Sequence, residues 1–433
     1  MLLRRTSDTA TLGERDTKLS IPRMRILVAN KFYWPKGGAE RVMFDLNRGY
    51  EKRGHEVVPF SMRSARNVPS PWAQHFVSEI DFTKPAGPIR KIGAALRTIH
   101  SREASRSIRA LVHEARPRVA HLHNFHHQLS PSIVDALREE GVPCVQTLHD
   151  YKWICPSYLL FTEGRVCERC KGGRFHEAVV HRCIHGSWAA SAVAAVEMTL
   201  QRAAHTLERG IRLAVSPSRF LADKLAEFGV DRARVRVVPN GVDLAELPPA
   251  AKAGDGFLFA GRLSLEKGVG HLLDAVGKAR GVRLSIAGEG PLEESLRRRA
   301  QEVAPGRVEF LGALPREQVL QRMRASRAVV LPSVCYENAP MSALEALGSG
   351  VPVIGTSLGG IPELVRQGLT GIVVEPANPT ALADALEMLE KDPAQARRYG
   401  ENARAMVAQE YALDRQVERM LAILEEVSSS ASR

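Results

Sequence analysis

The sequence predicts an α/β protein with two doubly wound, Rossmann-like domains that face each other across a cleft. Short apolar, β-branched runs alternate with helical segments along almost the whole chain, a pattern typical of parallel sheets. A Pro-, Ala- and Gly-rich stretch at 248–256 interrupts this series once. The length of 433 residues is too great for one ordinary domain and fits two such halves.

The first half begins with a buried strand over 24–30, a loop over 31–38 and a helix over 39–52. An Arg-rich helix is expected over 89–114. Further strands are expected at 55–61, 118–123, 143–148, 212–215 and 234–238. We expect this domain to occupy residues 24–243.

The second half repeats the alternation. Strands are expected at 257–260, 283–287, 308–311, 328–331, 351–354 and 371–374, each followed by turn residues and a helical segment. We expect residues 244–256 to be a linker and residues 257–399 to form the second domain. An amphipathic helix is expected over 400–427, within a carboxy-terminal segment 400–433 that packs back on the first domain.

Charge and apolar runs limit the location and the partners. No apolar run approaches the roughly 20 residues of a membrane span. Residues 1–23 are polar and lack a signal-like apolar stretch, so we expect a disordered leader and a cytoplasmic protein. Residues 24–243 carry 33 Lys and Arg against 21 Asp and Glu, whereas the rest of the chain is nearly neutral. The basic half indicates either contact with an anionic surface or substrate, or a solvated Arg-rich face. Nucleic-acid binding is not expected, because no recognition-helix or interleaved aromatic pattern accompanies the charge.

Two glycine-bearing loops follow strands of the second half. The segment from Gly261 to Gly268 contains Arg262 and Lys267 between a strand and a helix. Two cations in such a loop suit a diphosphate, and the glycines permit close backbone approach. The second loop begins at Gly288, and an ordinary glycine-rich turn is the alternative for each loop taken alone.

A pair of glutamates marks the next strand-to-helix connection. Glu337 is expected in the loop and Glu345 two turns into the following helix, among apolar neighbours. A carboxylate in that setting needs hydrogen-bond donors, and the two hydroxyls of a ribose are suitable. Backbone N–H groups at the start of this helix, around 338–341, suit phosphate. The alternative is that both acids are solvated or ion-paired surface groups.

These segments together resemble the large group of retaining GT-B glycosyltransferases (group 1, with glutamates in an E-x7-E pattern). The resemblance extends from Met24 to about Glu426. Its motifs in this sequence are GRLSLEKG, the glutamate pair, GVPVIGTSLGGIPELV, VVPNGVD and, in the first half, YWPKGGAERV and QTLHD.

The resemblance implies roles for individual residues. Arg262 and Lys267 would neutralise the departing diphosphate, Glu345 would hold the nucleotide ribose, and Glu337 would lie beside the donor sugar. His149 would face that sugar from the first domain, with a strand-end histidine bonded to backbone as the alternative. The remaining donor-binding positions are expected at Gly37, Gly38, Gly288, Asn338, Ala339, Pro340 and Met341.

The resemblance also implies an activity. The chain would move a hexose-type sugar from a UDP- or GDP-linked donor to a glycan or a polyprenyl-diphosphate-linked acceptor, with retention of anomeric configuration. No Asp-x-Asp pair is present, and the family needs no metal or cofactor for its chemistry. A surface-polysaccharide pathway is expected. The alternative is a non-catalytic nucleotide-sugar scaffold or sensor of the same fold.

Four cysteines fall in one insert, residues 151–187. Their count and spacing suit a structural, tetrahedral zinc, and the alternatives are reduced loop cysteines or a redox-labile pair. The expected ligands are Cys155, Cys167, Cys170 and Cys183, with His176, His181 and His185 as substitutes. Cys144 and Cys335 are expected to be packing residues. The insert follows His149 and is therefore expected to shape the acceptor side of the cleft.

A peripheral contact with the inner face of an anionic membrane is a further expectation. It rests on the basic first half, on the Arg-rich helix over 89–114 and on the aromatic triplet at 32–34. The alternative is that this helix packs on the sheet with its arginines in water.

Overall fold

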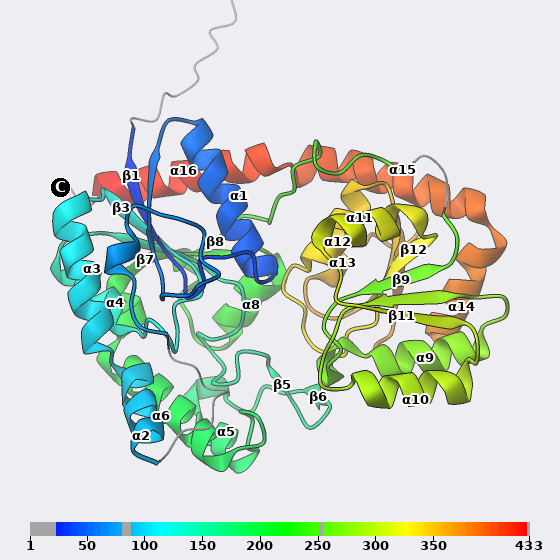
Figure 1. Ribbon diagram of the computed structural model, residues 1–433, viewed down its shortest axis with the longest axis horizontal. Coiled ribbons are helices and arrows are strands. Elements are labelled where there is room, and N and C mark those ends of the chain that lie inside the picture. Colours follow the sequence, from blue (N-terminus) through cyan, green and yellow to red (C-terminus); the bar gives the residue numbers. More distant parts are fainter. Residues whose placement is uncertain (1–22, 80–87, 251–253, 431–433) are drawn as a thin grey trace, which may run out of the picture.

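The structure, a computed structural model, describes residues 23–79, 88–250 and 254–430. Two parallel α/β domains lie side by side (Figure 1), which confirms the predicted fold class. The expected leader lies outside the described residues except for Arg23, as do 251–253 of the linker and the last three residues.

The first domain is built on a six-stranded parallel sheet with the order β2-β1-β3-β4-β7-β8. Its strands are β1 (Arg25–Ala29), β2 (Glu56–Phe60), β3 (Val119–Leu122), β4 (Cys144–Thr147), β7 (Ile211–Ser216) and β8 (Val235–Val237). Helices cover both faces, so the central strands β3 and β4 are buried at every residue. The helices are α1 (Gly38–Lys52), α2 (Pro88–Ile99), α3 (Arg102–Ala115), α4 (Ser132–Glu139), α5 (Glu177–Val180), α6 (Trp188–Ala204), α7 (Thr206–Gly210) and α8 (Arg219–Glu227).

The second domain repeats this plan with the strand order β11-β10-β9-β12-β13-β14. Its strands are β9 (Phe257–Ala260), β10 (Leu284–Ala287), β11 (Val308–Gly312), β12 (Ala328–Leu331), β13 (Val353–Thr356) and β14 (Gly371–Val374). Its helices are α9 (Val269–Lys278), α10 (Glu293–Val303), α11 (Arg316–Ala325), α12 (Met341–Gly348), α13 (Ile361–Leu364), α14 (Pro379–Lys391) and α15 (Pro393–Glu410). The last helix of the chain is α16 (Leu413–Ser430).

Two helices expected to be continuous are each divided. The Arg-rich segment forms α2 and α3, because the Ser101 hydroxyl accepts a hydrogen bond from the Ala104 N–H (3.1 Å) and caps a new helix. The carboxy-terminal segment forms α15 and α16. Between them, the Tyr411 carbonyl accepts from the Val242 N–H (2.9 Å) and the Leu413 N–H donates to the Val242 carbonyl (3.0 Å). This pairing with Val242 leaves the backbone at 411–413 unable to continue the helix.

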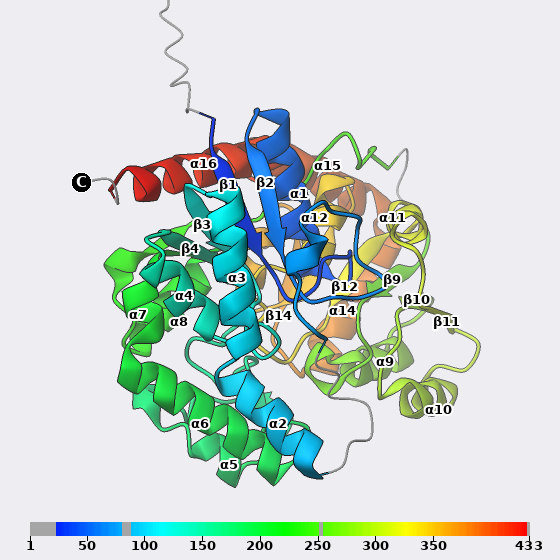
Figure 2. The ribbon, with the colours of Figure 1, turned by 60° about the vertical axis from the view of Figure 1, so that its left-hand side comes forward.

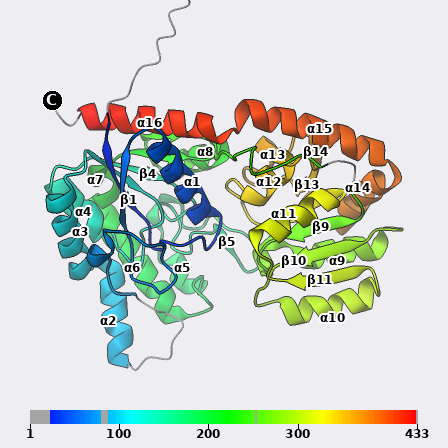
Figure 3. The same ribbon diagram turned by 45° about the horizontal axis from the view of Figure 1, so that its top comes forward.

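The carboxy-terminal helix α16 lies on the first domain, whereas α15 lies on the second (Figure 3). The apolar face of α16, which includes Val417, Met420 and Leu424, joins the core beneath β1 and α1. A Cβ on Gly49 of α1 would come within 2.4 Å of Val417, so a small residue is required there. The two last helices therefore tie both domains together across the linker.

The order of the strands indicates where a ligand binds. In each sheet the order reverses beside the first strand, between β1 and β3 and between β9 and β12. Open parallel sheets bind ligands at such reversals, at the carboxyl ends of the strands. The loops after β1, β4, β9 and β12, which contain most of the predicted site residues, lie there.

Candidate functional site

A cavity of 300 Å³ lies between the two domains at these strand ends. The first domain supplies the start of α1, the segment after β4 and a few residues near the linker; the second supplies the loops after β9 and β12. The lining residues are Gly38, Ala39, His149, Asp150, Tyr151, Tyr158, Leu159, Pro217, Asn240, Glu266, Lys267, Cys335, Tyr336, Glu337, Asn338, Ala339, Pro340 and Met341.

Lys267 and Glu337 form an ion pair in the wall of this cavity. The Lys267 Nζ donates to Glu337 Oε1 at 2.6 Å, and the Ser333 hydroxyl donates to the same oxygen at 2.6 Å. Burial by itself would raise the pKa of Glu337, but the Lys267 charge and both hydrogen bonds hold it below its ordinary value. The pair is ionised at neutral pH, so the positive charge of Lys267 is balanced while the cavity holds no ligand.

The loop after β13 holds the Glu337 backbone in place. The Gly360 N–H donates to the Glu337 carbonyl at 2.7 Å. Gly359 has a φ of +66°, and a Cβ there would lie 2.1 Å from the Glu337 carbonyl oxygen. The glycine pair in TSLGG is thus a support for the loop after β12, a role that the sequence analysis did not assign.

Glu345 lies in α12, outside the lining of the cavity, and is held by arginines from both domains. Arg41 of α1 approaches its Oε1 with Nη1 (3.2 Å), and Arg316 of α11 donates to the same oxygen with Nε (3.0 Å). Burial raises the pKa of Glu345 above its ordinary value, although Arg41 opposes the shift. Glu246 of the linker binds the same two arginines, each at 3.1 Å. These contacts form an ionic bridge between the domains.

His149 stands at the end of β4 and faces the cavity. Its Nε2 lies 2.9 Å from Nδ1 of His123, and the two rings are stacked. Burial, with a smaller contribution from the charge of Lys31, lowers the pKa of His149 to about 4. The imidazole is therefore neutral at neutral pH, and it can exchange hydrogen bonds with a sugar hydroxyl without carrying a charge.

Asn338 bridges the domains beside His149. Its Nδ2 donates to the Leu148 carbonyl (3.4 Å) and its Oδ1 accepts from the Ser218 hydroxyl (3.0 Å). The residue that precedes His149 is thus tied to the loop that carries Glu337. The sequence analysis assigned Asn338 to ligand binding through its backbone N–H. Both contacts use the side chain instead, so the sequence motif did not predict them.

The glycine and arginine positions predicted for donor binding separate into two groups. Gly38 lines the cavity, where a Cβ would lie 3.3 Å from Met341 Cγ. Gly37 and Gly288 lie outside the lining; at Gly288, φ is +140° and a Cβ would lie 1.9 Å from the Gly261 carbonyl oxygen. Arg262 is exposed and, like Gly37 and Gly288, is not part of the cavity lining.

Two buried polar atoms of the cavity wall have no hydrogen-bond partner among the described residues. They are the Tyr151 hydroxyl and Oδ1 of Asn240. Leaving such groups unpaired costs about 1–3 kcal/mol each, so a polar group that reached them would remove this cost. Neither residue was predicted; Asn240 lies in VVPNGVD, and its position at the domain junction is the signal that was available.

The cysteine-containing insert reaches across to the second domain. Its hairpin, β5 (Phe161–Thr162) and β6 (Arg165–Val166), packs through Phe161 against Val334 and Cys335. Glu168 accepts from the Tyr336 hydroxyl at 3.0 Å and from Lys224 Nζ at 2.9 Å. The insert therefore borders the cavity next to Glu337.

The arrangement of the cysteines does not support the predicted zinc site. All six cysteines are free thiols. Burial raises the pKa of Cys170, and the other three insert cysteines raise it further, so the four lie near one another. In the described part of the chain, however, no group of three or more Cys, His, Asp or Glu side chains is placed to hold a metal ion. Cys170 instead packs with Phe175 and Met198.

The aromatic triplet after β1 is not free to meet a membrane. Trp34 is buried in the core of the first domain, and its ring lies 4.6 Å from that of Phe32. Tyr33 packs against Phe44 and Phe76. Trp34 faces the core and Phe32 and Tyr33 are half-buried, so these contacts give the expected docking role no support.

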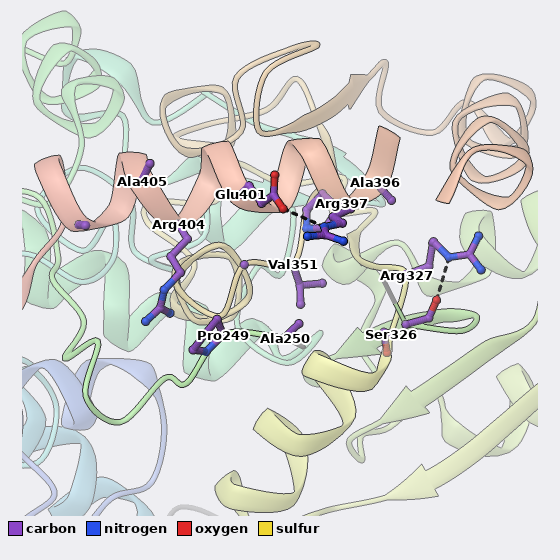
Figure 4. A pocket seen from close by; sticks show the side chains of 14 residues that line it. Pro249, Ala250, Ser326, Arg327, Val351, Ala396, Arg397, Glu401, Arg404 and Ala405 are labelled. Atoms are coloured by element: carbon purple, nitrogen blue, oxygen red, sulfur yellow. Dashed lines mark hydrogen bonds and ion pairs between the residues drawn. The ribbon is translucent and has the colours of Figure 1, made fainter. Parts of the chain in front are cut away.

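A second cavity, of 410 Å³, lies behind the second domain, between the linker and α15 (Figure 4). Of the arginines that line it, Arg397 pairs with Glu401 at 2.8 Å, and Arg327 and Arg404 bind backbone carbonyls. Arg327 Nη1 donates to the carbonyls of Leu389 and Glu390, both at 3.0 Å, and Arg404 donates to the Leu247 carbonyl at 2.6 Å. These contacts satisfy carbonyls at the end of α14 and in the linker. The lining of this cavity contains none of the predicted site residues.

Comparisons with known families divide the chain at the linker. Residues 36–246 match the family described as Glycosyltransferase Family 4, and residues 250–406 match Glycosyl transferases group 1. A glycogen synthase of Mycobacterium tuberculosis is 33% identical over 241 residues, 52% of this chain and 56% of the relative. A D-inositol 3-phosphate glycosyltransferase of Pseudarthrobacter chlorophenolicus is 30% identical over 274 residues, 59% of this chain and 58% of the relative. The chain thus spans a little over half the length of these curated relatives.

Solved structures share the fold over nearly the whole chain. Sucrose-phosphate synthase from Thermosynechococcus elongatus superposes with a TM-score of 0.73 at 20% identity, covering 94% of this chain and all of that one. HepE from Anabaena, in complex with UDP and glucose, gives a TM-score of 0.67 at 18% identity, covering 93% of this chain and all of that one. At these identities the likeness is one of fold.

Proposed function

We propose that this chain, which belongs to the group 1 glycosyltransferases of GT-B fold, transfers a hexose-type sugar from a UDP- or GDP-linked donor to a glycan or a polyprenyl-diphosphate-linked acceptor. We further propose that it does so with retention of configuration, in the cytoplasm, for a cell-surface polysaccharide. The observation that carries the proposal is the cavity between the domains, where neutral His149, the Lys267–Glu337 pair and two unpartnered polar groups meet.

A departing diphosphate would meet one cation of the cavity wall, Lys267, together with backbone donors. As the bond between sugar and phosphate breaks, negative charge grows on the phosphate oxygens, and fixed positive groups stabilise that charge. Lys267 is one such group, and the backbone N–H groups at the start of α12 are another. Arg262 would join them from the edge. A structure of HepE solved with UDP-glucose supports a nucleotide-sugar donor for this fold.

The sugar itself would lie between His149 and Glu337. His149 would bind a hydroxyl from the first domain, and the unpartnered Tyr151 hydroxyl and Asn240 Oδ1 would bind others. Glu345 would hold the ribose after exchanging the guanidinium of Arg41 or Arg316 for ribose hydroxyls. The residues assigned to the donor therefore come from both domains, so donor binding depends on how the two domains face each other.

A donor panel tests the proposal. Purified protein is mixed with UDP- and GDP-linked sugars, and both the melting temperature and the slow hydrolysis of each donor are measured. One donor is expected to raise the melting temperature and to be hydrolysed, and NMR of the released sugar is expected to show the anomeric configuration of the donor. A donor that stabilises the wild type but is never turned over, with any glycan or polyprenyl-diphosphate acceptor, would instead indicate the scaffold or sensor function.

A further inference from the structure

The outward face of α6 is apolar along most of its length. Between Trp188 and Leu200, every exposed or half-buried residue of the helix is uncharged, and all but Thr199 are apolar. The Thr199 hydroxyl donates back to the Ala195 carbonyl at 2.7 Å, so this side chain is satisfied within the helix. A helix at the surface of a soluble domain normally presents charged residues to water, and one that is apolar all round is normally covered.

Apolar side chains of the neighbouring helices extend this face. Among the described residues, nine large hydrophobic side chains are strongly exposed, and five of them lie on α2, α5 and α6. Trp188 is 65% exposed and Leu200 51% exposed; the others are Leu96, Val180 and Val196. Both α2 and α5 pack against α6. Figures 1 and 2 show the three helices together at the end of the first domain opposite α16.

The inner face of α6 is firmly held, so the outward face is a fixed surface. Ala195 and Met198 pack against Phe175 and Cys170 of the insert. Glu197, fully buried, accepts from Lys152 Nζ at 2.8 Å. Breaking such a buried pair is costly, so α6 cannot rotate to hide its apolar side. Lys152 is two residues beyond Asp150, which lines the cavity, so this ion pair links α6 to the segment that borders the candidate site.

The charges around this face favour an anionic partner. Residues 165–209 carry seven basic and four acidic side chains. Among the described residues, ion pairs use Glu168 and Glu197, and they also use Arg165 and Arg169 (with Glu163) and Lys171 (with Glu227). The basic side chains of this segment outside those pairs are Arg174, Arg182, Arg202 and Arg209. An apolar strip with a tryptophan at one end and basic residues around it matches the headgroup region of an anionic bilayer.

We propose that α6, with Leu96 and Val180 beside it, docks this protein on the surface of an anionic lipid bilayer. The helix would lie in the plane of the interface, with its apolar face among the acyl chains near the headgroups and the basic residues on the lipid phosphates. In the described residues no helix is both long and apolar enough to cross a membrane, so the contact is peripheral. Docking through α6 would bring the insert side of the cavity to the lipid surface.

Vesicle sedimentation with the full chain tests the docking surface. Vesicles of phosphatidylcholine alone are compared with vesicles that contain phosphatidylglycerol as well. Wild-type protein is expected to bind the anionic vesicles and to bind the neutral ones much more weakly, with salt reducing the binding. The double variant Val196→Glu/Leu200→Glu is expected to lower the affinity about tenfold or more, because two carboxylates would enter the apolar layer.

A matched control separates the face from a general effect of charge. Met388 on α14 is 52% exposed in the second domain, and Met388→Glu is expected to leave vesicle binding unchanged. The melting temperature confirms that each variant is folded. Hydrolysis of a soluble donor is expected to be equal in all three proteins, so failure of the docking surface is distinguished from failure of the proposed reaction.

Three results would overturn the inference. The first is wild-type protein that binds both kinds of vesicle equally or binds neither kind. The second is a double variant that binds as the wild type does. The third is a wild-type dimer in light scattering that becomes a monomer in the double variant, which would make this face a contact between two copies of the chain.

Discussion

Replacing Lys267 by methionine would leave a buried carboxylate without its cation. The Glu337 side chain is only 13% exposed, and Lys267 is 29% exposed, with the two charged atoms 2.6 Å apart. Breaking a fully buried pair costs about 3–5 kcal/mol. Because Lys267 is partly exposed and Ser333 still donates to the carboxylate, we expect Lys267→Met to lower the unfolding free energy by about 2–3 kcal/mol.

A double-mutant cycle isolates the pair. Glu337→Gln leaves Lys267 without its counter-charge, and the double variant removes both charges together. We expect the sum of the two single-variant losses in unfolding free energy to exceed the loss in the double variant by about 1–3 kcal/mol, a coupling typical of charged residues in contact. Urea unfolding of donor-free protein at pH 7 measures all four members. Single losses that add within about 0.5 kcal/mol would refute the coupling.

The pH dependence of the cycle has a definite sign. The folded pKa of Glu337 is lowered in the wild type, so the pair contributes stability above the unfolded pKa of about 4.3 and loses it as the pH falls through the folded pKa. In Lys267→Met, burial is opposed only by the Ser333 hydrogen bond and raises the folded pKa of Glu337, so that variant gains stability on acidification. We therefore expect the gap between wild type and Lys267→Met to narrow from pH 7 to pH 5. The same variant is expected to lose donor turnover by about a hundredfold or more.

Three further predictions use the site and the insert. Tyr151→Phe is expected to leave donor-free stability unchanged or about 1 kcal/mol higher, because an unpartnered hydroxyl is removed, while the melting shift caused by the donor shrinks. Tyr50→Phe is the control, because it loses a hydrogen bond to His121 (3.2 Å). Its stability is expected to fall while the donor-induced rise in melting temperature is kept. An equal rise in the two variants would contradict a role for Tyr151. Glu345→Gln is expected to weaken donor binding about tenfold or more, whereas Glu246→Gln, which touches the same arginines, leaves it near wild type; calorimetric titration with the nucleotide diphosphate compares them. Elemental analysis of purified protein is expected to find well below one zinc per chain, and a stoichiometric value would restore the four-cysteine site.

Local patterns in the sequence were sufficient for the fold class. The alternation of apolar runs and helical segments depends on hydrogen bonds and periodicities within a few residues, and both sheets follow it. The prediction of a continuous carboxy-terminal helix failed because a segment distant in the sequence competes with the local helical preference. Residues 411–413 were expected to be helical, but they pair with Val242, just before the linker, a contact that no local pattern contains.

The sequence by itself determined which chemical groups stand at the strand ends of the two domains. Lys267 and Glu337 were placed there by glycine-turn and strand-to-helix patterns, and His149 by the resemblance of QTLHD to the glycosyltransferase family. The tertiary structure alone decided how these groups are paired. Lys267 meets Glu337 across 70 residues, and Asn338 reaches Leu148 across 190. Lys267 and Glu337 meet because β9 and β12 are neighbours in one sheet, whereas Asn338 and Leu148 meet because the two domains approach each other. Burial then sets the pKa values of such groups, so neither the partners nor the shifts can be read from residue order.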